Sequence, residues 1–360
     1  MFQTTARWAW SNCGEGVRLV PISSRRDNER KISGLVTAET LLPSHATTPL
    51  RRRPLLVTGA HRSGTTWVAN TLAADEATAY LPELFNPDHF HQRLCGIRFP
   101  FWFMRIEPDG DPRYHTYLSK MLSWEFGWHD AAAATIRSPG ACVQAARVAH
   151  AFRQSRTRNR RPLLKDPIAV FSAEWLAETF AMDVLVLVRH PAAFAASLSR
   201  LDWRFDFTNF LSQPSLMSTD LAPFADEIEA AARRPPDPIA EAGLLWKSIY
   251  ATVDRYRRER PRWMFVRHED LSADPSNGFH AICRRTGIGL SGDIADMVRR
   301  STSPENPIDA PRGVAHAVMR DSRRAARSWR RRMDSREIAL LRASVEDVAS
   351  RFYTDEEWTE

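Results

Sequence analysis

The sequence is poor in lysine, in cysteine and in long apolar runs. Only four of its 50 basic residues are lysine, so a lysine inside a motif is informative. The four cysteines, at positions 13, 95, 142 and 283, have the spacing of neither a metal site nor a disulfide framework. They indicate free thiols in a reducing cytoplasm, and we therefore expect a cytoplasmic protein.

Two further absences bear on whether the chain contains a membrane-spanning or secretory segment. No stretch approaches the run of about 18 apolar residues that a membrane-spanning helix needs. The first residues also lack the basic-then-apolar pattern of a secretory signal. We expect no transmembrane segment.

The composition is that of a globular protein with a basic surface. The chain has 360 residues, 43% of them hydrophobic and 26% charged, which suffices for a substantial core. Its net charge of +7 favours anionic partners, whether nucleic acid, membrane surface or phosphorylated small molecule. Residues 1–50 have no sustained periodicity and are expected to be a flexible extension, with a single α/β domain over 51–360.

The chain is organised around residues 54–67. An apolar strand over 55–57 breaks at Gly59 into a tight loop, and Gly64 opens an apolar-periodic helix. Unpaired N–H groups and the positive end of the helix dipole meet at such a turn, which favours a phosphate-type ligand. Arg62 adds a planar fork of donors suited to an oxyanion.

The same loop departs from that of nucleotide kinases. Gly59 and Gly64 have the spacing G-x-x-x-x-G, but Thr65 stands where a kinase has lysine, and the cation is at Arg62. This argues against ordinary ATP or GTP chemistry. A kinase-like enzyme remains an alternative that Mg²⁺-dependent ATP turnover would support, and the glycines alone are also explained by a helix cap.

Further apolar runs predict more strands, alternating with helices. The strands are expected at 78–81, 162–165, 184–188 and 263–266. Alternation of this kind predicts a three-layer, P-loop-like α/β fold with a central parallel sheet, interrupted by insertions at about 88–160 and 203–238. Ligands then sit beyond the carboxyl ends of the strands. Four polar residues stand there: Arg62, Glu83, Lys165 and Arg189.

Two motifs carry a resemblance to sulfotransferases. The first resembles the signature with which that family holds the 5′-phosphosulfate of 3′-phosphoadenosine 5′-phosphosulfate (PAPS). Its residues are Arg62, Ser63, Gly64, Thr65, Thr66 and Trp67. Arg189, followed by Ser197 on the next helix, resembles the motif that holds the 3′-phosphate. Trp67 resembles the tryptophan that stacks on the adenine, although core packing explains it equally well.

The resemblance implies metal-independent transfer of a sulfuryl group from PAPS to an acceptor hydroxyl. Lys165 resembles the lysine of the K-D-P element of tyrosylprotein sulfotransferases, which supports the leaving group; an ordinary ion pair with Asp166 is the alternative. Glu83 follows a Tyr-Leu-Pro sequence similar to the Y-L-x-E-P element of carbohydrate sulfotransferases, which makes it the candidate base. Cytosolic members use a histidine, so His61, His89 and His91 are rivals.

The acceptor and the basic C-terminal region stay open. Aromatic residues at 99–103 and 203–210 are candidates for the acceptor pocket and slightly favour a carbohydrate, but phenols, lipids or core packing also fit. Residues 320–332 are expected to form one basic helix that contacts the 3′-phosphate or is simply solvated. One face of this helix is expected to carry Arg320, Arg323, Arg324, Arg327 and Arg331. A nucleic-acid-binding protein that uses this helix is the second alternative, although no specific nucleic acid is expected. The acceptor is expected to be a small molecule or a glycan.

Overall fold

A computed structural model describes residues 52–87, 97–137, 142–234, 237–310 and 317–359, all within the compact unit Leu50–Glu360. Its centre is a five-stranded parallel sheet in the order β2-β3-β1-β4-β5. The strands are β1 (Leu55–Gly59), β2 (Thr78–Pro82), β3 (Arg161–Lys165), β4 (Asp183–Val188) and β5 (Met264–Arg267). All five predicted strands are confirmed. The predicted extension, residues 1–50, lies outside the described residues.

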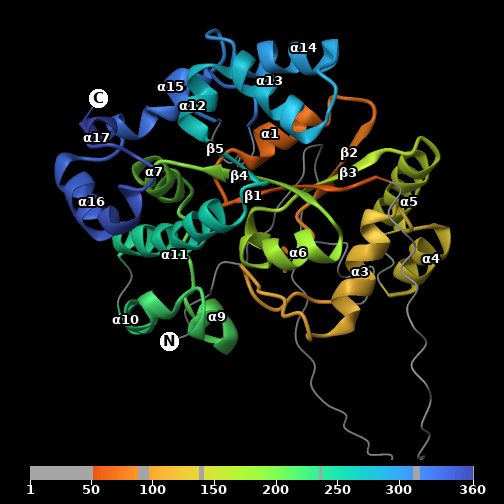
Figure 1. Cartoon of the computed structure of the whole chain (residues 1–360), viewed down its shortest axis with the longest axis horizontal. Coiled ribbons are helices and arrows are strands. Elements are labelled where there is room, and N and C mark those ends of the chain that lie inside the picture. The colour runs from red at the N-terminus through yellow and green to blue at the C-terminus, as the bar shows by residue number, and fades with distance from the viewer. Residues whose placement is uncertain (1–51, 88–96, 138–141, 235–236, 311–316, 360) are drawn as a thin grey trace, which may run out of the picture. The chain divides into compact units, whose positions relative to one another are not determined.

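Helices cover both faces of this sheet (Figure 1). Because side chains alternate along a strand, Leu55 and Val57 of β1 face one core and Leu56 the other. The first core is closed by α1 (Thr65–Leu72), α13 (Pro275–Thr286) and α14 (Gly292–Thr302). The second is closed by α6 (Ala173–Thr179), α7 (Pro191–Leu201), α11 (Pro238–Glu259) and α16 (Ser335–Ala349). The predicted three-layer α/β fold is confirmed.

The remaining elements lie in the insertions and the C-terminal region. The first insertion contains α3 (Pro112–Leu122), α4 (Trp128–Arg137) and α5 (Cys142–Thr157). Residues 203–238, which have no regular pattern in the sequence, form α8 (Thr208–Leu211), α9 (Pro214–Ser218), the 3₁₀ turn η3 (Ala222–Phe224) and α10 (Ala225–Arg233). The segment after β5 begins with α12 (His268–Ala273), and α17 (Glu356–Thr359) lies near the C-terminus.

Two helix predictions need correction. The helix expected after Lys165 begins as a 3₁₀ helix, η2 (Pro167–Ser172), before it becomes α6. The single basic helix expected over 320–332 is wrong: the chain forms α15 (Ser322–Ala326) and a 3₁₀ turn, η4 (Ser328–Arg331). The tighter turn carries Trp329 into the core, where it is 3% exposed.

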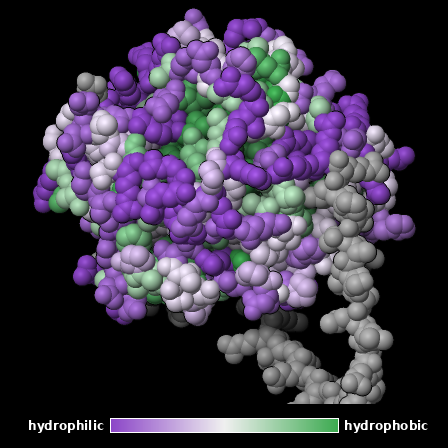
Figure 2. All heavy atoms as spheres, in the orientation of Figure 1, coloured by the Kyte–Doolittle hydropathy of each residue, from purple (hydrophilic) through white to green (hydrophobic). Residues whose placement is uncertain are grey.

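The described residues include no helix long and apolar enough to cross a membrane. The face of the molecule in Figure 2 is mostly hydrophilic, and its apolar residues gather in patches between polar side chains. Large apolar side chains are concentrated in the two cores beside the sheet.

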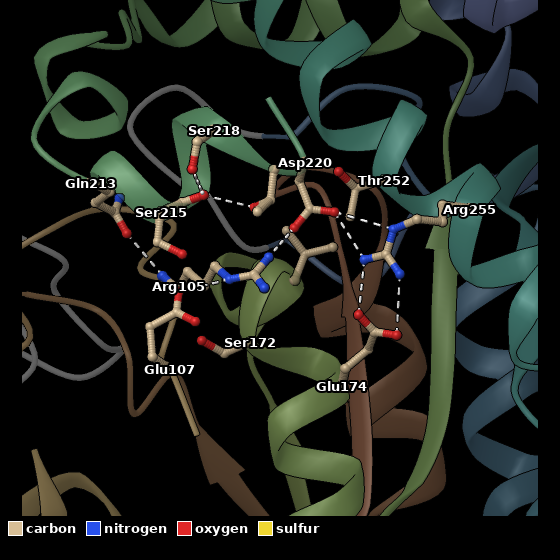
Figure 3. Close-up of polar contacts among 12 residues, drawn as sticks. Arg105, Glu107, Ser172, Glu174, Gln213, Ser215, Ser218, Asp220, Thr252 and Arg255 are labelled. Atoms are coloured by element: carbon tan, nitrogen blue, oxygen red, sulfur yellow. Dashed lines mark hydrogen bonds and ion pairs between the residues drawn. The ribbon is translucent and has the colours of Figure 1, made fainter. Parts of the chain in front are cut away.

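An ion-pair network ties the two insertions to the helices of the second core (Figure 3). Asp220, whose side chain is 4% exposed, pairs with Arg105 from the first insertion and with Arg255 of α11 at 2.9 Å. Arg255 also pairs with Glu174 of α6 at 2.8 Å. These residues line an open groove whose inner charges neutralise one another. Asp220 therefore serves as the shared anion that joins both insertions to the core.

Replacing Asp220 tests this role. Asp220→Asn leaves two arginines without their common counter-charge and should lower the free energy of unfolding by about 1–3 kcal/mol. Glu229→Gln is the control, because Glu229 forms an exposed pair with Arg233 and should change stability by less than about 0.5 kcal/mol. Urea unfolding measures both, and equal small effects would show that the network does not hold the insertions.

Candidate active site

The loop between β1 and α1 has a backbone that its two glycines make possible. Gly59 (φ 136°), Arg62 (φ 66°) and Gly64 (φ 90°) all have positive φ. A Cβ on Gly59 would lie 2.3 Å from the carbonyl oxygen of Leu187, and one on Gly64 would lie 2.5 Å from the His268 ring. Positive φ on both sides of Ser63 is typical of a loop whose N–H groups bind an anion, and α1 begins there without a side-chain cap. The loop can therefore hold an anion.

The two predicted anion motifs are in direct contact. Arg62 Nε donates a hydrogen bond to Ser197 Oγ at 3.1 Å, and Arg189 Nη1 donates to the carbonyl oxygen of Arg62. Arg189 Nε is buried without a hydrogen-bond partner among the described residues. Sequence reasoning placed these groups at opposite ends of one ligand, whereas the structure joins them into one continuous cationic surface.

Three further arginines extend this surface. Burial, together with the positive charges of Arg189, Arg200 and Arg320, lowers the pKa of Arg62 to about 9. Burial with Arg189, Arg332 and Arg200 lowers the pKa of Arg320 to about 10. All remain protonated at neutral pH, so their mutual repulsion costs free energy that a bound anion would relieve.

Helix α11 supports both anion motifs through two buried side chains. Trp246 donates its indole N–H to the carbonyl oxygen of Arg189 at 2.8 Å. One turn later, the buried Tyr250 hydroxyl accepts the Arg189 N–H at 3.2 Å and bonds Ser63 Oγ at 2.6 Å. Sequence reasoning missed both residues. Their (i, i+4) spacing on an amphipathic helix marks a buried face but not which loops it reaches.

The C-terminal region packs against the end of β4. Trp329 of η4 stacks on His190, with ring centroids 5.0 Å apart and planes at 10°. Arg320 precedes α15 and donates to the carbonyl oxygen of Ile308, while Arg323, Arg324, Arg327 and Arg331 are exposed. The five arginines therefore do not form one face, and Arg320 is the one that joins the cationic surface.

Glu83 and Lys165 form a buried ion pair at the ends of neighbouring strands. Pro82 of β2 lies opposite Lys165 of β3, which brings Glu83 against the lysine, and Lys165 Nζ bonds Glu83 Oε1. Asn86 Nδ2 donates to the other carboxylate oxygen of Glu83 at 3.1 Å. Burial alone would lower the pKa of Lys165, but Glu83 and Tyr80 outweigh it and raise the pKa above its ordinary value. Lys165 thus pairs with Glu83 rather than with Asp166.

The neighbouring Asp166 is fully buried. Its Oδ2 accepts the backbone N–H of Phe85 at 2.8 Å, and its Oδ1 has no hydrogen-bond partner among the described residues. Burial, followed by the negative charge of Glu83, raises the pKa of Asp166 to about 8. Sequence reasoning gave this residue no role beyond a possible ion pair with Lys165.

Of the three histidines that are alternatives to Glu83 as the base, the structure describes only His61. The half-buried His61 packs against the rings of Phe103, Phe194 and Trp203, and desolvation with the charge of Arg62 lowers its pKa to about 3. A neutral imidazole of such low basicity is a weak proton acceptor near pH 7. His89 and His91 lie outside the described residues.

Trp67 lies within the core beside the loop. Its indole N–H donates to Ser301 Oγ at 3.0 Å, and its ring meets Phe279 and His268 edge-to-face. With 8% of its surface exposed, this position favours packing, and contact with an adenine stays a prediction. Thr65 is buried and Thr66 half-buried at the start of α1.

The last sequence features to place are the cysteines and a possible metal site. Cys142 is exposed and Cys283 buried, both free, while Cys13 and Cys95 lie outside the described residues. Among the described residues, no cluster of histidine, cysteine and carboxylate side chains is arranged to hold a metal ion.

Arginines gathered over a glycine-rich loop, beside a buried lysine, are what an α/β enzyme needs to hold a phosphorylated group donor. The model of the sulfotransferase family matches residues 54–292, from the start of β1 to the start of α14. The chain therefore belongs to the sulfotransferase family, and it is a sulfotransferase.

Solved bacterial structures are similar at low sequence identity. The sulfotransferase domain of the curacin biosynthetic pathway is 15% identical, with 83% of this chain and 96% of that chain covered and a TM-score of 0.46. The sulfotransferase domain of the Synechococcus PCC 7002 olefin synthase is 16% identical, with 88% and 99% covered and a TM-score of 0.46. A sulfotransferase from Mycobacterium avium is 16% identical, with 86% and 78% covered and a TM-score of 0.41. The comparison with curated proteins found no match.

Asp166 should make stability depend on pH. Because its folded-state pKa is about 8, against 3.8 when unfolded, unfolding releases a proton between these values. Stability from this group is thus present below about pH 4 and is lost as pH rises toward 8. Asp166→Asn should remove that loss. Urea unfolding should therefore show that the free energy of unfolding of the variant rises relative to that of the wild type between pH 5 and pH 8.

Thr58→Val is the control for this measurement. Thr58 Oγ1 donates to the carbonyl oxygen of Asp166 at 2.8 Å, so the change alters the same cluster without removing an ionisable group. Its stability difference from the wild type should be constant with pH. If the stability difference between Asp166→Asn and the wild type were also constant with pH, the raised pKa of Asp166 would be wrong.

Proposed function

We propose that this sulfotransferase takes its sulfuryl group from PAPS and transfers it to an acceptor hydroxyl. The observation that carries the proposal is the contact of Arg62 with Ser197 and Arg189, which unites the two motifs expected to grip the phosphates of that donor. A donor with anionic groups at two positions suits a cationic surface that extends from the loop to the end of β4. ADP would leave part of this surface without a counter-charge.

Arg62, Arg189 and the loop fit such a donor in chemical terms. The unpartnered Nε of Arg189 is a buried donor that lacks an acceptor. The positive φ values of Gly59, Arg62 and Gly64 suit a loop whose N–H groups would bind the anion. Arg62, Ser63, Gly64, Thr65 and Thr66 would hold the phosphosulfate end, while Arg189 and Ser197 would hold the 3′-phosphate.

Bound PAPS supplies an activated sulfuryl group on a phosphate oxygen. In the proposed transfer the S–O bond to that oxygen breaks and a new S–O bond forms to the acceptor oxygen. Lys165 neutralises the charge that develops on the leaving oxygen, together with Arg62. Glu83 accepts the proton of the acceptor hydroxyl. Because Lys165 and Glu83 are bonded to each other, Lys165 exchanges one oxygen partner for another as this charge develops, which releases the Glu83 carboxylate.

The acceptor is proposed to be a carbohydrate hydroxyl on a small molecule or glycan. An aromatic ring stands beside Arg62: its guanidinium lies 5.5 Å from the ring centroid of the half-buried Trp203. The His61 ring contacts both Trp203 and Phe103, and Phe103 contacts Phe205. Sugars stack on such faces, with polar groups between them. The expected absence of a metal and of a nucleic-acid partner, and the cytoplasmic location, remain predictions.

Substitution of the buried pair tests the proposed chemistry. Glu83→Gln removes the proton acceptor and should lower kcat by about 10²- to 10⁴-fold. Lys165→Ala should lower it by about 10²- to 10³-fold. Release of adenosine 3′,5′-bisphosphate from PAPS with a panel of sugar and phenol acceptors measures both.

Glu76→Gln is the matched control, because Glu76 is an exposed glutamate between α1 and β2 and should leave kcat unchanged. Full activity of Glu83→Gln would show that Glu83 is not the base and would make a histidine the candidate. Absence of PAPS-dependent transfer by the wild type on every acceptor would contradict the proposed donor.

A further inference from the structure

Asp166 has a geometry that the proposed chemistry leaves unexplained. It stands at the N-cap position of η2, where an aspartate usually accepts N–H groups of its own helix. Its side chain caps no N–H of η2. Instead, Oδ2 accepts the N–H of Phe85, a residue 81 positions earlier in the chain. The backbone N–H of Ile168 in η2 is near enough to act on the Asp166 pKa, but the hydrogen bond to Phe85 connects η2 to a second segment.

The segment that Asp166 reaches is the turn that carries Glu83. In this turn the Asn86 N–H bonds the carbonyl oxygen of Glu83 at 3.3 Å, and the Asn86 side chain bonds the Glu83 carboxylate. Phe85 lies between them, fully buried. A displacement of Phe85 would thus shift both Glu83 and the amide that orients its carboxylate.

The backbone of Asp166 is fixed on the other side. Its N–H donates to the carbonyl oxygen of Val57 at 3.0 Å, and its carbonyl oxygen accepts from Thr58 Oγ1 at 2.8 Å. Lys165, the residue before it, carries the cation that pairs with Glu83. Asp166 is thus anchored to β1, adjacent to the lysine and tethered to the turn of the glutamate.

We propose that Asp166 is a positioning residue that sets the Glu83 carboxylate against Lys165 through its hydrogen bond to the Phe85 N–H. The burial of Oδ1 without a partner supports this inference, because an unsatisfied buried oxygen costs free energy that an apolar residue would avoid. The proposal rests on the proposed function, in which Glu83 accepts a proton. It assigns to Asp166 no contact with donor or acceptor.

A double-mutant cycle tests whether Asp166 acts through Glu83. Asp166→Ala removes the tether and should lower kcat by about 10- to 100-fold, with little change in affinity for adenosine 3′,5′-bisphosphate. In the Glu83→Gln background the same change should cost less than about 3-fold, because the group it positions is already gone. Equal losses in both backgrounds would overturn the proposal.

Hydrogen exchange gives a readout that needs no activity. The peptide that contains residues 83–87 should exchange faster in Asp166→Ala than in the wild type, while Glu76→Gln, at an exposed position outside this network, should leave it unchanged. Unchanged exchange in Asp166→Ala would overturn the tether. If the proposed function fails, Glu83→Gln keeps full activity, yet the exchange result still stands.

A milder variant covers the case in which Asp166→Ala does not fold. Asp166→Asn keeps an oxygen that accepts the Phe85 N–H and should retain kcat within about 3-fold of the wild type at pH 7. Asp166→Leu, with the same branching at Cγ but without an acceptor, should show the loss expected for the alanine variant. Equal activity of the asparagine and leucine variants would contradict a role for the hydrogen bond.

Discussion

Mutual repulsion among arginines is the constraint on which the rest of this site depends. Burial lowers the pKa values of Arg62 and Arg320, and the nearby charges of Arg189 and Arg200 act on both in the same direction. Such a cluster is stable only because the surrounding fold enforces it. Tyr250 and Trp246 hold the two loops from α11, and Gly59 and Gly64 permit a backbone that other residues would clash with. Relief of this repulsion by a bound anion is the physical reason for which we propose an anionic donor.

The buried pair of Glu83 and Lys165, to which we assign the proposed chemistry, follows from the topology of the sheet. Parallel strands in the order β2-β3-β1-β4 place the residues that follow them at one edge, so Glu83 and Lys165 meet although 82 positions separate them. Placing both groups at the ends of buried strands excludes water from the ion pair. It also means that their spacing depends on backbone tethers such as that from Asp166.

Much of this could be predicted from the sequence, for identifiable reasons. Buried parallel strands are continuous apolar runs, and glycine or proline ends them, so Arg62, Glu83, Lys165 and Arg189 could be placed at strand ends. The contacts among them could not be predicted. Tyr250 is 187 positions from Ser63, and nothing local marks the pair. The basic helix over 320–332 was wrong because arginine spacing suggested one face, whereas burial of Trp329 against His190 set the local turn.

The most direct test of a two-anion donor site is calorimetry with adenosine 3′,5′-bisphosphate and with ADP. The 3′-phosphate should add charge-assisted hydrogen bonds, each of about 1.5–3 kcal/mol, so the bisphosphate should bind at least about 10-fold more tightly. Ser197→Ala should reduce that preference, while Arg324→Ala, at an exposed position, should not. Equal affinity for the two nucleotides, or tighter binding of ADP, would contradict the account.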